Sequence, residues 1–330
     1  MMKTLTVAVP SYNVERYLAD SAASYCAAGV DERLEVLIVD DGSTDNTPVI
    51  ASACAEMFPE VFRVVTKANG GHGSAINAGI REARGKYFRV IDGDDRICSA
   101  NVSALLDELD EASEDLVIDM KREVMMGTLE SRLLSLPDEL PRECTVDFEE
   151  VCNRSDIEEF FMIHSTNVRT DFLRKHEVSL LEHTFYVDYE FIVKVASRAQ
   201  TVRFLDLEAC NYYIGNSEQS VAPLNYVKRW DDHTRVTREL LDFTRNEPCD
   251  GERRRFVESR VDLLVNTHYN IALIYDPNRK RGLVRAHEFR AYLKDYHPRE
   301  FRAGEKRYWQ ARVLHTLGFD AAKLDRLMRR

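Results

Sequence analysis

The chain lacks long apolar runs and paired cysteines. No window approaches 18 uninterrupted apolar residues, so a transmembrane helix is not expected. The first apolar run, Leu5–Val9, stops at Pro10 without a small-residue cleavage pattern, which indicates a first strand rather than a signal peptide. The seven cysteines are scattered and form no C-x-x-C pair. They indicate neither a zinc site nor a disulfide framework, and a reducing cytoplasm is favoured.

Two phosphate-binding fingerprints are also missing. The glycine-rich segment Gly70–Ala75 fits neither G-x-G-x-x-G nor the Walker A pattern. The first strand also lacks the dinucleotide fingerprint, so a dinucleotide-dependent oxidoreductase is the least favoured class. The loop after the first strand, Pro10–Asn13, contains no glycine. A nucleotidyltransferase typically opens with a loop rich in glycine and basic residues, and this absence weakens that reading without removing it.

Positive charge is scarce except at the carboxyl end. The net charge is −11, and an acidic body argues against general nucleic-acid binding. Residues 275–330 nevertheless hold 15 lysines and arginines against 7 acidic residues. This basic tail is expected to be a solvated helical surface, a contact with an anionic membrane face, or a contact with an acidic partner. A homodimer through these helices is a further alternative.

The first 120 residues alternate between short apolar runs and helix-length segments. This pattern indicates parallel strands joined by crossover helices, with helices on both faces of the sheet. The expected strands are 5–9, 34–39, 61–66, 87–91 and 116–119, and the expected helices are 14–28, 44–57, 74–84 and 101–109. The alternation of strands and helices stops over 121–154. Beyond it, a short helix is expected at 168–176, and two strands are expected at 202–205 and 210–214. From residue 224 onward helical patterning dominates.

Polar residues gather where the expected strands end. In an open α/β sheet, ligands bind at the carboxyl ends of the strands. Four independent segments converge on this edge: Pro10-Ser11-Tyr12-Asn13, Asp40-Asp41-Gly42-Ser43, Lys67-Ala68-Asn69-Gly70-Gly71 and Asp92-Gly93-Asp94-Asp95. That convergence is more specific than any one motif, and it predicts a ligand site along the edge. His72 in the third loop is expected either to touch a phosphate or to be exposed.

The fourth segment places three carboxylates around Gly93, directly after a buried strand. Like charges this close repel one another, and a hard divalent cation with oxygen ligands removes the conflict. Such ions commonly share their coordination between a few carboxylates and phosphate oxygens. The segment therefore predicts a metal site that also holds a nucleotide diphosphate, with Mg²⁺ or Mn²⁺ as the cation.

These segments, together with Asn77-x-Gly79, resemble the signature of the family 2 glycosyltransferases. The resemblance covers residues 3–100, extends more weakly over 160–222, and is absent from the helical tail. It implies a GT-A fold, a Rossmann-like and mostly parallel sheet flanked by helices, followed here by a C-terminal helical extension. It further implies 1–222 as the catalytic domain (1–120 nucleotide-binding half, 121–222 acceptor half) and 223–330 as a helical region.

The resemblance also implies roles for single residues. Pro10 and Tyr12 would border the nucleobase, Asp41 would bind uracil, Asp92 would approach the ribose or metal, and Asp94 would be the direct metal ligand supported by Asp95. The remaining residues expected to contact the nucleotide-sugar are Asn13, Asp40, Lys67, Asn69, Gly70, Gly71, Asn77 and Gly93.

An inverting transfer needs a general base for the acceptor hydroxyl. In the family this is an aspartate at a loop-to-helix junction in the second half, a place taken here by Asp188. Val187 stands where an acidic residue is commoner, so Glu190 is the alternative base. His164 is a candidate for the acceptor cleft, and Gln219 and Ser220 for a closing loop over the donor.

The resulting hypothesis is a metal-dependent inverting transfer of a sugar, usually from a UDP-sugar, to a glycan, lipid-linked or other hydroxyl acceptor. Synthesis of a cell-wall glycan or another surface polysaccharide is the expected setting, in the cytoplasm or at the inner face of the membrane. The alternatives are a nucleotidyltransferase on a related fold and a non-catalytic relative that binds nucleotide-sugars.

Overall fold

The computed structural model describes residues 3–26, 31–215, 222–247 and 249–328. The chain forms two compact units. The first contains Met1–His183, Val187–Asn216 and Cys249–Arg253, and the second contains Thr184–Tyr186, Ser217–Pro248 and Arg254–Arg330. The functional division of 1–222 into a nucleotide half and an acceptor half stays a prediction.

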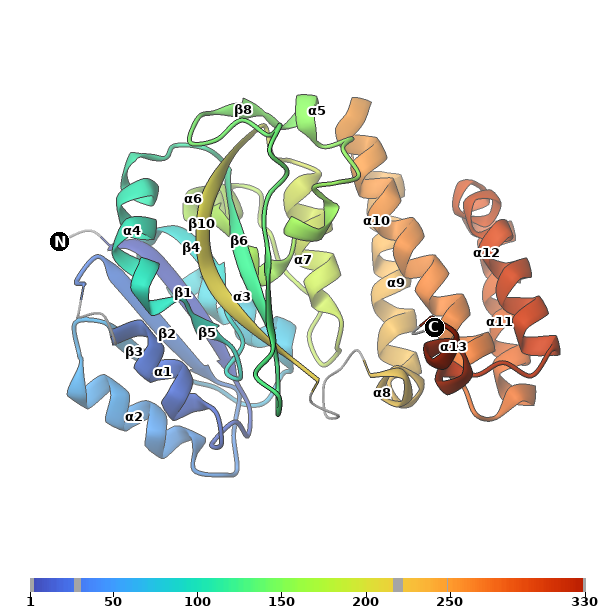
Figure 1. The fold of residues 1–330 in the computed structure, drawn as a ribbon, viewed down its shortest axis with the longest axis horizontal. Coiled ribbons are helices and arrows are strands. Elements are labelled where there is room, and N and C mark those ends of the chain that lie inside the picture. The colour runs from blue at the N-terminus through green and yellow to red at the C-terminus, as the bar shows by residue number, and fades with distance from the viewer. Residues whose placement is uncertain (1–2, 27–30, 216–221, 248, 329–330) are drawn as a thin grey trace. The chain divides into compact units, whose positions relative to one another are not determined.

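A mixed sheet forms the centre of the first unit (Figure 1). Within the described residues it has ten strands: β1 (Lys3–Ser11), β2 (Leu34–Asp40), β3 (Phe62–Thr66), β4 (Gly85–Val90), β5 (Arg96–Ile97), β6 (Leu116–Met125), β7 (Ser131–Leu134), β8 (Val146–Asp147), β9 (Thr166–Arg169) and β10 (Thr201–Ile214). The main order is β3-β2-β1-β4-β9-β6-β10-β5, with β7 beside β6 and β8 beside β10.

The helices of this unit are α1 (Leu18–Cys26), α2 (Thr47–Met57), α3 (His72–Glu82), α4 (Val102–Glu111), α5 (Phe148–Val151), α6 (Thr170–Lys175) and α7 (Val187–Ala196), with short 3₁₀ turns at Ser99–Asn101, Glu158–Phe160 and Ile163–Ser165. Strands β1 to β4 pair in parallel, as the alternation of strands and helices predicts. Strands β5, β7, β8 and β9 add antiparallel pairs. The expected α/β class is confirmed.

Two local expectations were wrong in the second half of this unit. Val168 was expected in a helix, but it lies in β9, opposite Phe88 of β4 and Leu116 of β6. The strands expected at 202–205 and 210–214 form the single strand β10, because an irregularity after Phe204 interrupts the apolar pattern without ending the ladder. Apolar periodicity cannot show a strand that continues through a bulge.

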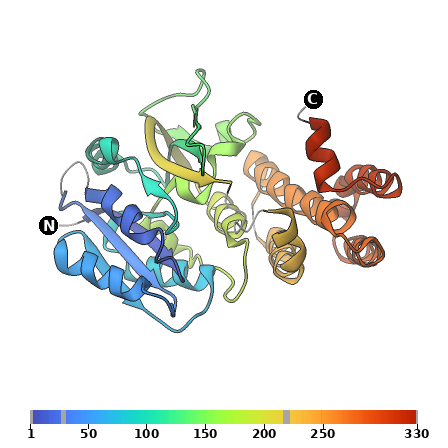
Figure 2. The same ribbon diagram turned by 60° about the horizontal axis from the view of Figure 1, so that its bottom comes forward.

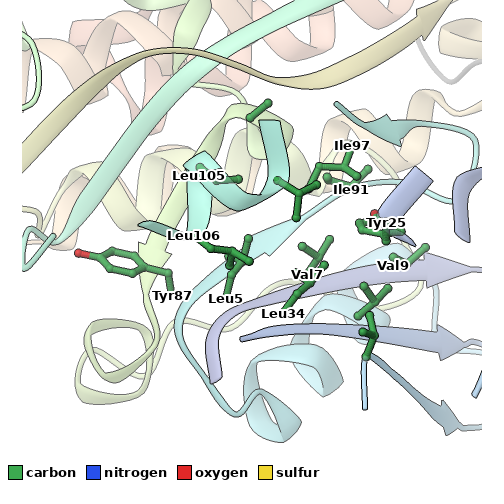
Figure 3. Packing of buried hydrophobic residues seen from close by; sticks show 14 of the residues in the cluster. Leu5, Val7, Val9, Tyr25, Leu34, Tyr87, Ile91, Ile97, Leu105 and Leu106 are labelled. Atoms are coloured by element: carbon green, nitrogen blue, oxygen red, sulfur yellow. The ribbon is translucent and has the colours of Figure 1, made fainter. Parts of the chain in front are cut away.

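The main core packs one face of the parallel strands against α1 and α4 (Figure 3). Leu5, Val7 and Val9 alternate along β1, as a strand requires, and meet Tyr25 of α1 and Leu105 of α4. On the opposite face, a smaller cluster packs strand β2 against α3. Strands covered on both faces explain the continuous apolar runs in the sequence.

One buried ion pair connects β4 to β6. Arg89 and Asp119 are both fully buried, and their closest nitrogen and oxygen atoms lie 2.5 Å apart. Asn167 of β9 donates a hydrogen bond to the same carboxylate at 2.8 Å, and Arg89 also donates to the carbonyl of His164. Removing either charge alone would leave the other uncompensated, which costs about 3–5 kcal/mol.

The second unit is helical (Figure 2). Its elements are α8 (Pro223–Lys228), α9 (Trp230–Asn246), most of α10 (Gly251–Asn270), a π-helical turn (Ile271–Tyr275), α11 (Arg279–Tyr296), α12 (Pro298–Thr316) and α13 (Ala321–Met328). The C-terminal helical region expected from the sequence is therefore present. Among the helices of the described residues, none is long and apolar enough to cross a membrane.

Two fully buried histidines lie in contact at the centre of these helices. Nδ1 of His233 lies 2.9 Å from Nδ1 of His268, and Trp230 stacks on the His268 ring at 3.9 Å. Burial lowers the pKa of His233 to about 3. Burial, and then the charges of His233, Arg238 and Arg285, lower the pKa of His268 well below its usual range. Both rings are therefore neutral in the folded protein.

We expect the His233–His268 pair to make a destabilising contribution that grows as the pH falls from 7 to 5. The unfolded histidines bind protons below about pH 6.5 and the folded ones do not, so the free energy of unfolding falls by up to about 2 kcal/mol per histidine. Circular dichroism melts across this pH range measure the effect. The variant His268→Phe should show a shallower dependence, whereas the exposed control His287→Asn should follow the wild type. Equal pH dependence in all three proteins would contradict the assignment.

Candidate functional site

The strands β1, β2 and β3 end at one level on the edge of the sheet. Ser11 pairs with Asp40, and Asp40 with Thr66, so the loops that follow these strands start side by side. Strand β4 joins the same edge through its parallel pairing with β1, and the acidic segment begins two residues after its end. The edge expected from the sequence is thus built by backbone register.

The first two loops are connected by side-chain hydrogen bonds. Asn13 has a positive φ of 54°, its backbone NH donates to Ser43 Oγ at 3.1 Å, and its Oδ1 accepts from the backbone NH of Thr44 at 2.8 Å. Tyr12 beside it is half exposed, and Pro10 lies within β1. Asn13 therefore fixes the loop that presents the Tyr12 ring to solvent.

Asp41 holds the third loop. Its carboxylate accepts from Lys67 Nζ at 2.5 Å and from the backbone NH groups of Gly70 and Gly71 at 3.0 and 2.7 Å, and its carbonyl accepts from Asn69. The Asp41 side chain is 4% exposed. These bonds show a structural role, and the contact with a base implied for Asp41 stays a prediction.

Asp40 is also buried and accepts a hydrogen bond from the backbone NH of Ser43 at 3.0 Å. Its carboxylate shapes the turn after β2. The role in donor binding expected for Asp40 is not tested by this contact and stays a prediction.

The acidic segment after β4 forms a tight cluster. One carboxylate oxygen from each of Asp92, Asp94 and Asp95 lies within 4.8 Å of the others. Burial, and then the charge of Asp92, raises the pKa of Asp94 to about 6. Burial with the charges of Asp94 and Asp92 raises the pKa of Asp95 well above its usual range, although Asp95 accepts from the backbone NH of Tyr213 at 2.8 Å. Buried Gly93 packs against Val14.

His72, the first residue of α3, lies between two of the aspartates. Its Nε2 is 2.9 Å from Asp92 Oδ1, and its Nδ1 is 3.4 Å from Oδ1 of Asp188. Burial opposes protonation of the ring, but Asp92, Asp188 and Asp94 outweigh it and raise the pKa of His72 to about 9. The imidazolium in turn lowers the pKa of Asp92 despite burial of that carboxylate. His72 therefore links the acidic segment to α7.

Three contacts hold the loop before α7 against α3. The Asn77 side chain donates to the carbonyl of Leu180 at 2.9 Å and accepts from its NH at 2.8 Å. The NH of His183 donates to the carbonyl of Gly70 at 2.5 Å. Gly73 lies so close to Leu181 that a β-carbon would come within 2.1 Å of its carbonyl oxygen. Helix α3 and the glycine-rich loop before it thus hold residues 180–183, the segment that leads toward α7.

The remaining candidates lie in different environments. Glu190 is fully buried, accepts from the NH of Leu181 and pairs with Lys194 at 2.6 Å. His164 is 5% exposed, stacks on Tyr212 at 4.5 Å and lies 3.3 Å from Lys121 Nζ. Gln219 and Ser220 fall outside the described residues.

Sequence reasoning missed what His72 and Asn77 contact. His72 is the one titratable side chain of the segment 69–75, and that signal singles it out. Its two carboxylate partners come from segments 20 and 116 residues away, and sequence spacing does not show such a meeting. The Asn77 side chain joins α3 to Leu180, and the contact with the ligand expected for Asn77 stays a prediction.

The arrangement places a carboxylate cluster suited to a hard cation beside a second, separate carboxylate. The Asp188 side chain is 45% exposed, and burial raises its pKa above the usual range. Such a group can take a proton from a hydroxyl held in front of it. The edge therefore combines a candidate cation site with a candidate general base.

Comparisons with known proteins bear on the family and the fold. Residues 6–176 match the family model described as glycosyl transferase family 2. The glycosyltransferase EpsJ of Bacillus subtilis, described as uncharacterized, is 35% identical over 117 residues, which is 36% of this chain and 33% of that protein. The minor teichoic acid biosynthesis protein GgaB of the same organism is 31% identical over 114 residues, 34% of this chain and 13% of that protein. The chain thus spans a third or less of these two relatives.

Among solved structures, the chain resembles S. aureus TarS 1–349 in complex with UDP-GlcNAc, with a TM-score of 0.66. The match covers 96% of this chain and 92% of that chain at 17% identity. At this identity the likeness supports the fold alone.

Proposed function

The chain belongs to glycosyl transferase family 2, and from this membership we propose that it is an inverting enzyme that transfers a sugar from a UDP-sugar to an acceptor hydroxyl. The observation that supports the proposal most is the meeting of Asp92, Asp94 and Asp95 with Asp188 at one edge, bridged by His72. Two separate carboxylate functions are what a metal-dependent transfer with a general base requires.

The acidic cluster fits a divalent cation. Its three carboxylates are close together. The pKa values of Asp94 and Asp95 are raised by burial and by the neighbouring carboxylates, so the negative charges of this cluster repel one another. Asp94 with Asp92 would hold Mg²⁺ or Mn²⁺, which prefer such oxygen ligands. When bound, the cation would offset the negative charge of the departing diphosphate.

Asp188 would be the base. The acceptor oxygen attacks the anomeric carbon on the face opposite the diphosphate, its proton passes to the Asp188 carboxylate, and the bond from carbon to diphosphate oxygen breaks. Glu190 fits this role less well, because it is fully buried and paired with Lys194. Holding the acceptor oxygen in line with the departing diphosphate, and its proton within reach of the base, is worth a large share of the barrier.

On the donor side, the half-exposed ring of Tyr12 is suited to stacking on the base, and Asp41 with Lys67 would set the loop that borders it. TarS is described in complex with UDP-GlcNAc, and GgaB as a teichoic acid biosynthesis protein. These descriptions support a UDP-sugar as donor and a cell-surface glycan as product. The cytoplasmic location favoured by the sequence stays a prediction.

A panel of nucleotide-sugars tests the proposal. The protein is melted with UDP-, GDP- and TDP-sugars, with and without Mn²⁺, and the nucleotide released on long incubation is measured. A cognate donor at 100 times its Kd should stabilise the protein by about 2.7 kcal/mol. Slow release of UDP supports transfer to water in place of the acceptor. No stabilisation by any nucleotide-sugar would contradict the proposal.

The same assay separates the alternatives. A nucleotidyltransferase would bind a nucleoside triphosphate with a sugar phosphate and release pyrophosphate, not UDP. A non-catalytic relative would be stabilised by the donor and release nothing. Tyr12 and Asn13, in place of a glycine-rich first loop, favour the glycosyltransferase.

We expect His72→Ala to lower kcat about 10- to 100-fold, because misplacing a catalytic group by 1 Å costs rates of that order. The variant removes the ring that lies against Asp188 and Asp92. Nucleotide release measured against donor concentration separates kcat from KM. The control is Asp138→Asn, an exposed carboxylate on a loop of the same unit. A His72→Ala protein with wild-type kcat would remove His72 from this positioning role.

A further inference from the structure

One side of α12 exposes large apolar side chains. Trp309, Val313 and Leu317 are 55%, 56% and 67% exposed. They recur every four residues, so they form a stripe along one side of the helix and the residue after its end. The buried side of the same helix is formed by Gly304, Tyr308, Ala311 and His315. We call Trp309, Val313 and Leu317 the α12 stripe.

An exposed apolar stripe is common and is not by itself a site, but this one is bordered by uncompensated cations. Arg302 and Lys306 are exposed and precede Trp309 on the same side of α12. Lys323 and Arg326 follow on α13: Lys323 Nζ donates to the carbonyl of Gly318, the residue after Leu317, and Arg326 donates to the carbonyl of Ala322 within α13. Within the described part of the chain, these four cations form no ion pair with a carboxylate.

Two other arginines, Arg299 of α12 and Arg290 of α11, differ from these four. Arg299 pairs with Asp262, and Arg290 pairs with Glu305 at 2.7 Å. Arg299 and Arg290 are thus paired with carboxylates, whereas Arg307 and Arg312 of α12 bond to the neutral side chains of Asn270 and Thr316. Basic side chains next to an apolar stripe complement a surface whose outer layer is anionic and whose interior is apolar.

The orientation of Trp309 agrees with such a surface. Its Nε1 donates to Glu305 at 3.3 Å, and the Arg290 guanidinium lies 5.9 Å from its ring. These contacts hold one edge of the indole, and the side chain remains more than half exposed. Tryptophan is enriched where lipid headgroups meet the apolar interior, because its ring is apolar and its NH is polar.

We propose that the α12 stripe and its four cations dock the second unit on an anionic lipid bilayer. Trp309, Val313 and Leu317 would enter the headgroup boundary, and Arg302, Lys306, Lys323 and Arg326 would lie among acidic headgroups. This inference does not depend on the proposed function. If both hold, transfer takes place at a membrane surface, where lipid-linked acceptors are presented.

Vesicle sedimentation with the full chain tests the proposal. We expect at least tenfold tighter binding to vesicles of phosphatidylcholine with phosphatidylglycerol than to phosphatidylcholine alone, and weaker binding as salt rises. The emission of Trp309 should shift to shorter wavelength on binding, and the shift should be absent in Trp309→Phe. No binding to anionic vesicles, or equal binding to both kinds, would overturn the proposal.

Two variants identify the surface. Arg302→Glu with Lys306→Glu should lower the affinity for anionic vesicles at least tenfold. The control Arg132→Glu with Lys175→Glu makes the same charge change at exposed positions of the first unit and should bind as the wild type. Equal loss in both variants would mean that net charge alone drives binding, and it would overturn the assignment to α12.

The triple variant Trp309→Ser, Val313→Ser and Leu317→Ser separates a bilayer from a protein partner. It should bind anionic vesicles at least tenfold more weakly and should fold normally, because all three side chains are exposed. If the wild-type chain dimerises without lipid and the triple variant does not, a second copy covers the stripe and the bilayer proposal fails. Because none of these readouts uses a sugar donor, an inactive transferase would leave them unchanged.

Discussion

Replacing Asp188 with asparagine is expected to lower kcat by a factor of about 10² to 10⁴, the contribution of a positioned general base. The amide keeps the size of the side chain but cannot accept the proton of the acceptor hydroxyl. The KM for the donor should stay within about threefold, since the lost interaction belongs to the transition state. Nucleotide release with saturating donor measures the change, and calorimetric binding of UDP confirms that the donor side is intact.

The control for this variant is Glu190→Gln. The Glu190 carboxylate is buried, bonded to the NH of Leu181 and paired with Lys194. Its loss should therefore reduce thermal stability and leave kcat of the folded enzyme near the wild-type value. The reverse outcome, with Asp188→Asn active and Glu190→Gln folded but inactive, would assign the base to Glu190.

Replacing Asp94 with asparagine is expected to weaken metal-dependent donor binding by a factor of about 100 or more, because even outer-shell partners of a metal contribute 10- to 100-fold. Titration of Mn²⁺ and UDP in a calorimeter measures the loss. The metal-free variant should melt a few degrees higher than the wild type, since it no longer carries a buried charge beside Asp92. A variant that is more stable but no longer binds metal and donor would show that repulsion between the carboxylates destabilises the empty site and that the bound cation relieves it.

Asp138→Asn makes the same change of charge at an exposed position and should alter neither property. Donor binding by Asp94→Asn that matches the wild type in the presence of Mn²⁺ would remove Asp94 from its role. Loss of binding in both variants would point to net charge rather than to the cluster.

The parallel half of the fold could be predicted from sequence because its signals are local. The largely apolar strand Leu34–Asp40 is buried throughout and ends at a polar loop, so both the strand and its edge are visible in a single segment. The antiparallel strand β9 is different. Val168 belongs to a segment of four residues whose strand character depends on β4 and β6, which lie far away in the sequence.

The same distinction applies to the site. Asp92, Asp94 and Asp95 are adjacent in sequence, and like-charge crowding alone indicated their meeting. Asn77 and Asp41 carried recognisable motif positions, but their side-chain bonds go to Leu180 and to the third loop. A motif marks which residues matter, whereas the partner of each side chain depends on rotamers and loop paths that the motif does not encode.

The buried pair of Arg89 and Asp119 constrains how this protein can diverge. The pair joins the strand that leads into the acidic cluster to the strand beside it, and Asn167 and the His164 carbonyl complete its hydrogen bonds. Losing one charge costs about 3–5 kcal/mol, comparable with the whole stability margin of many proteins. The pair can therefore be lost in evolution only when both residues are substituted together. Positions 89 and 119 should co-vary among homologues, whereas the surrounding apolar residues should vary independently of them.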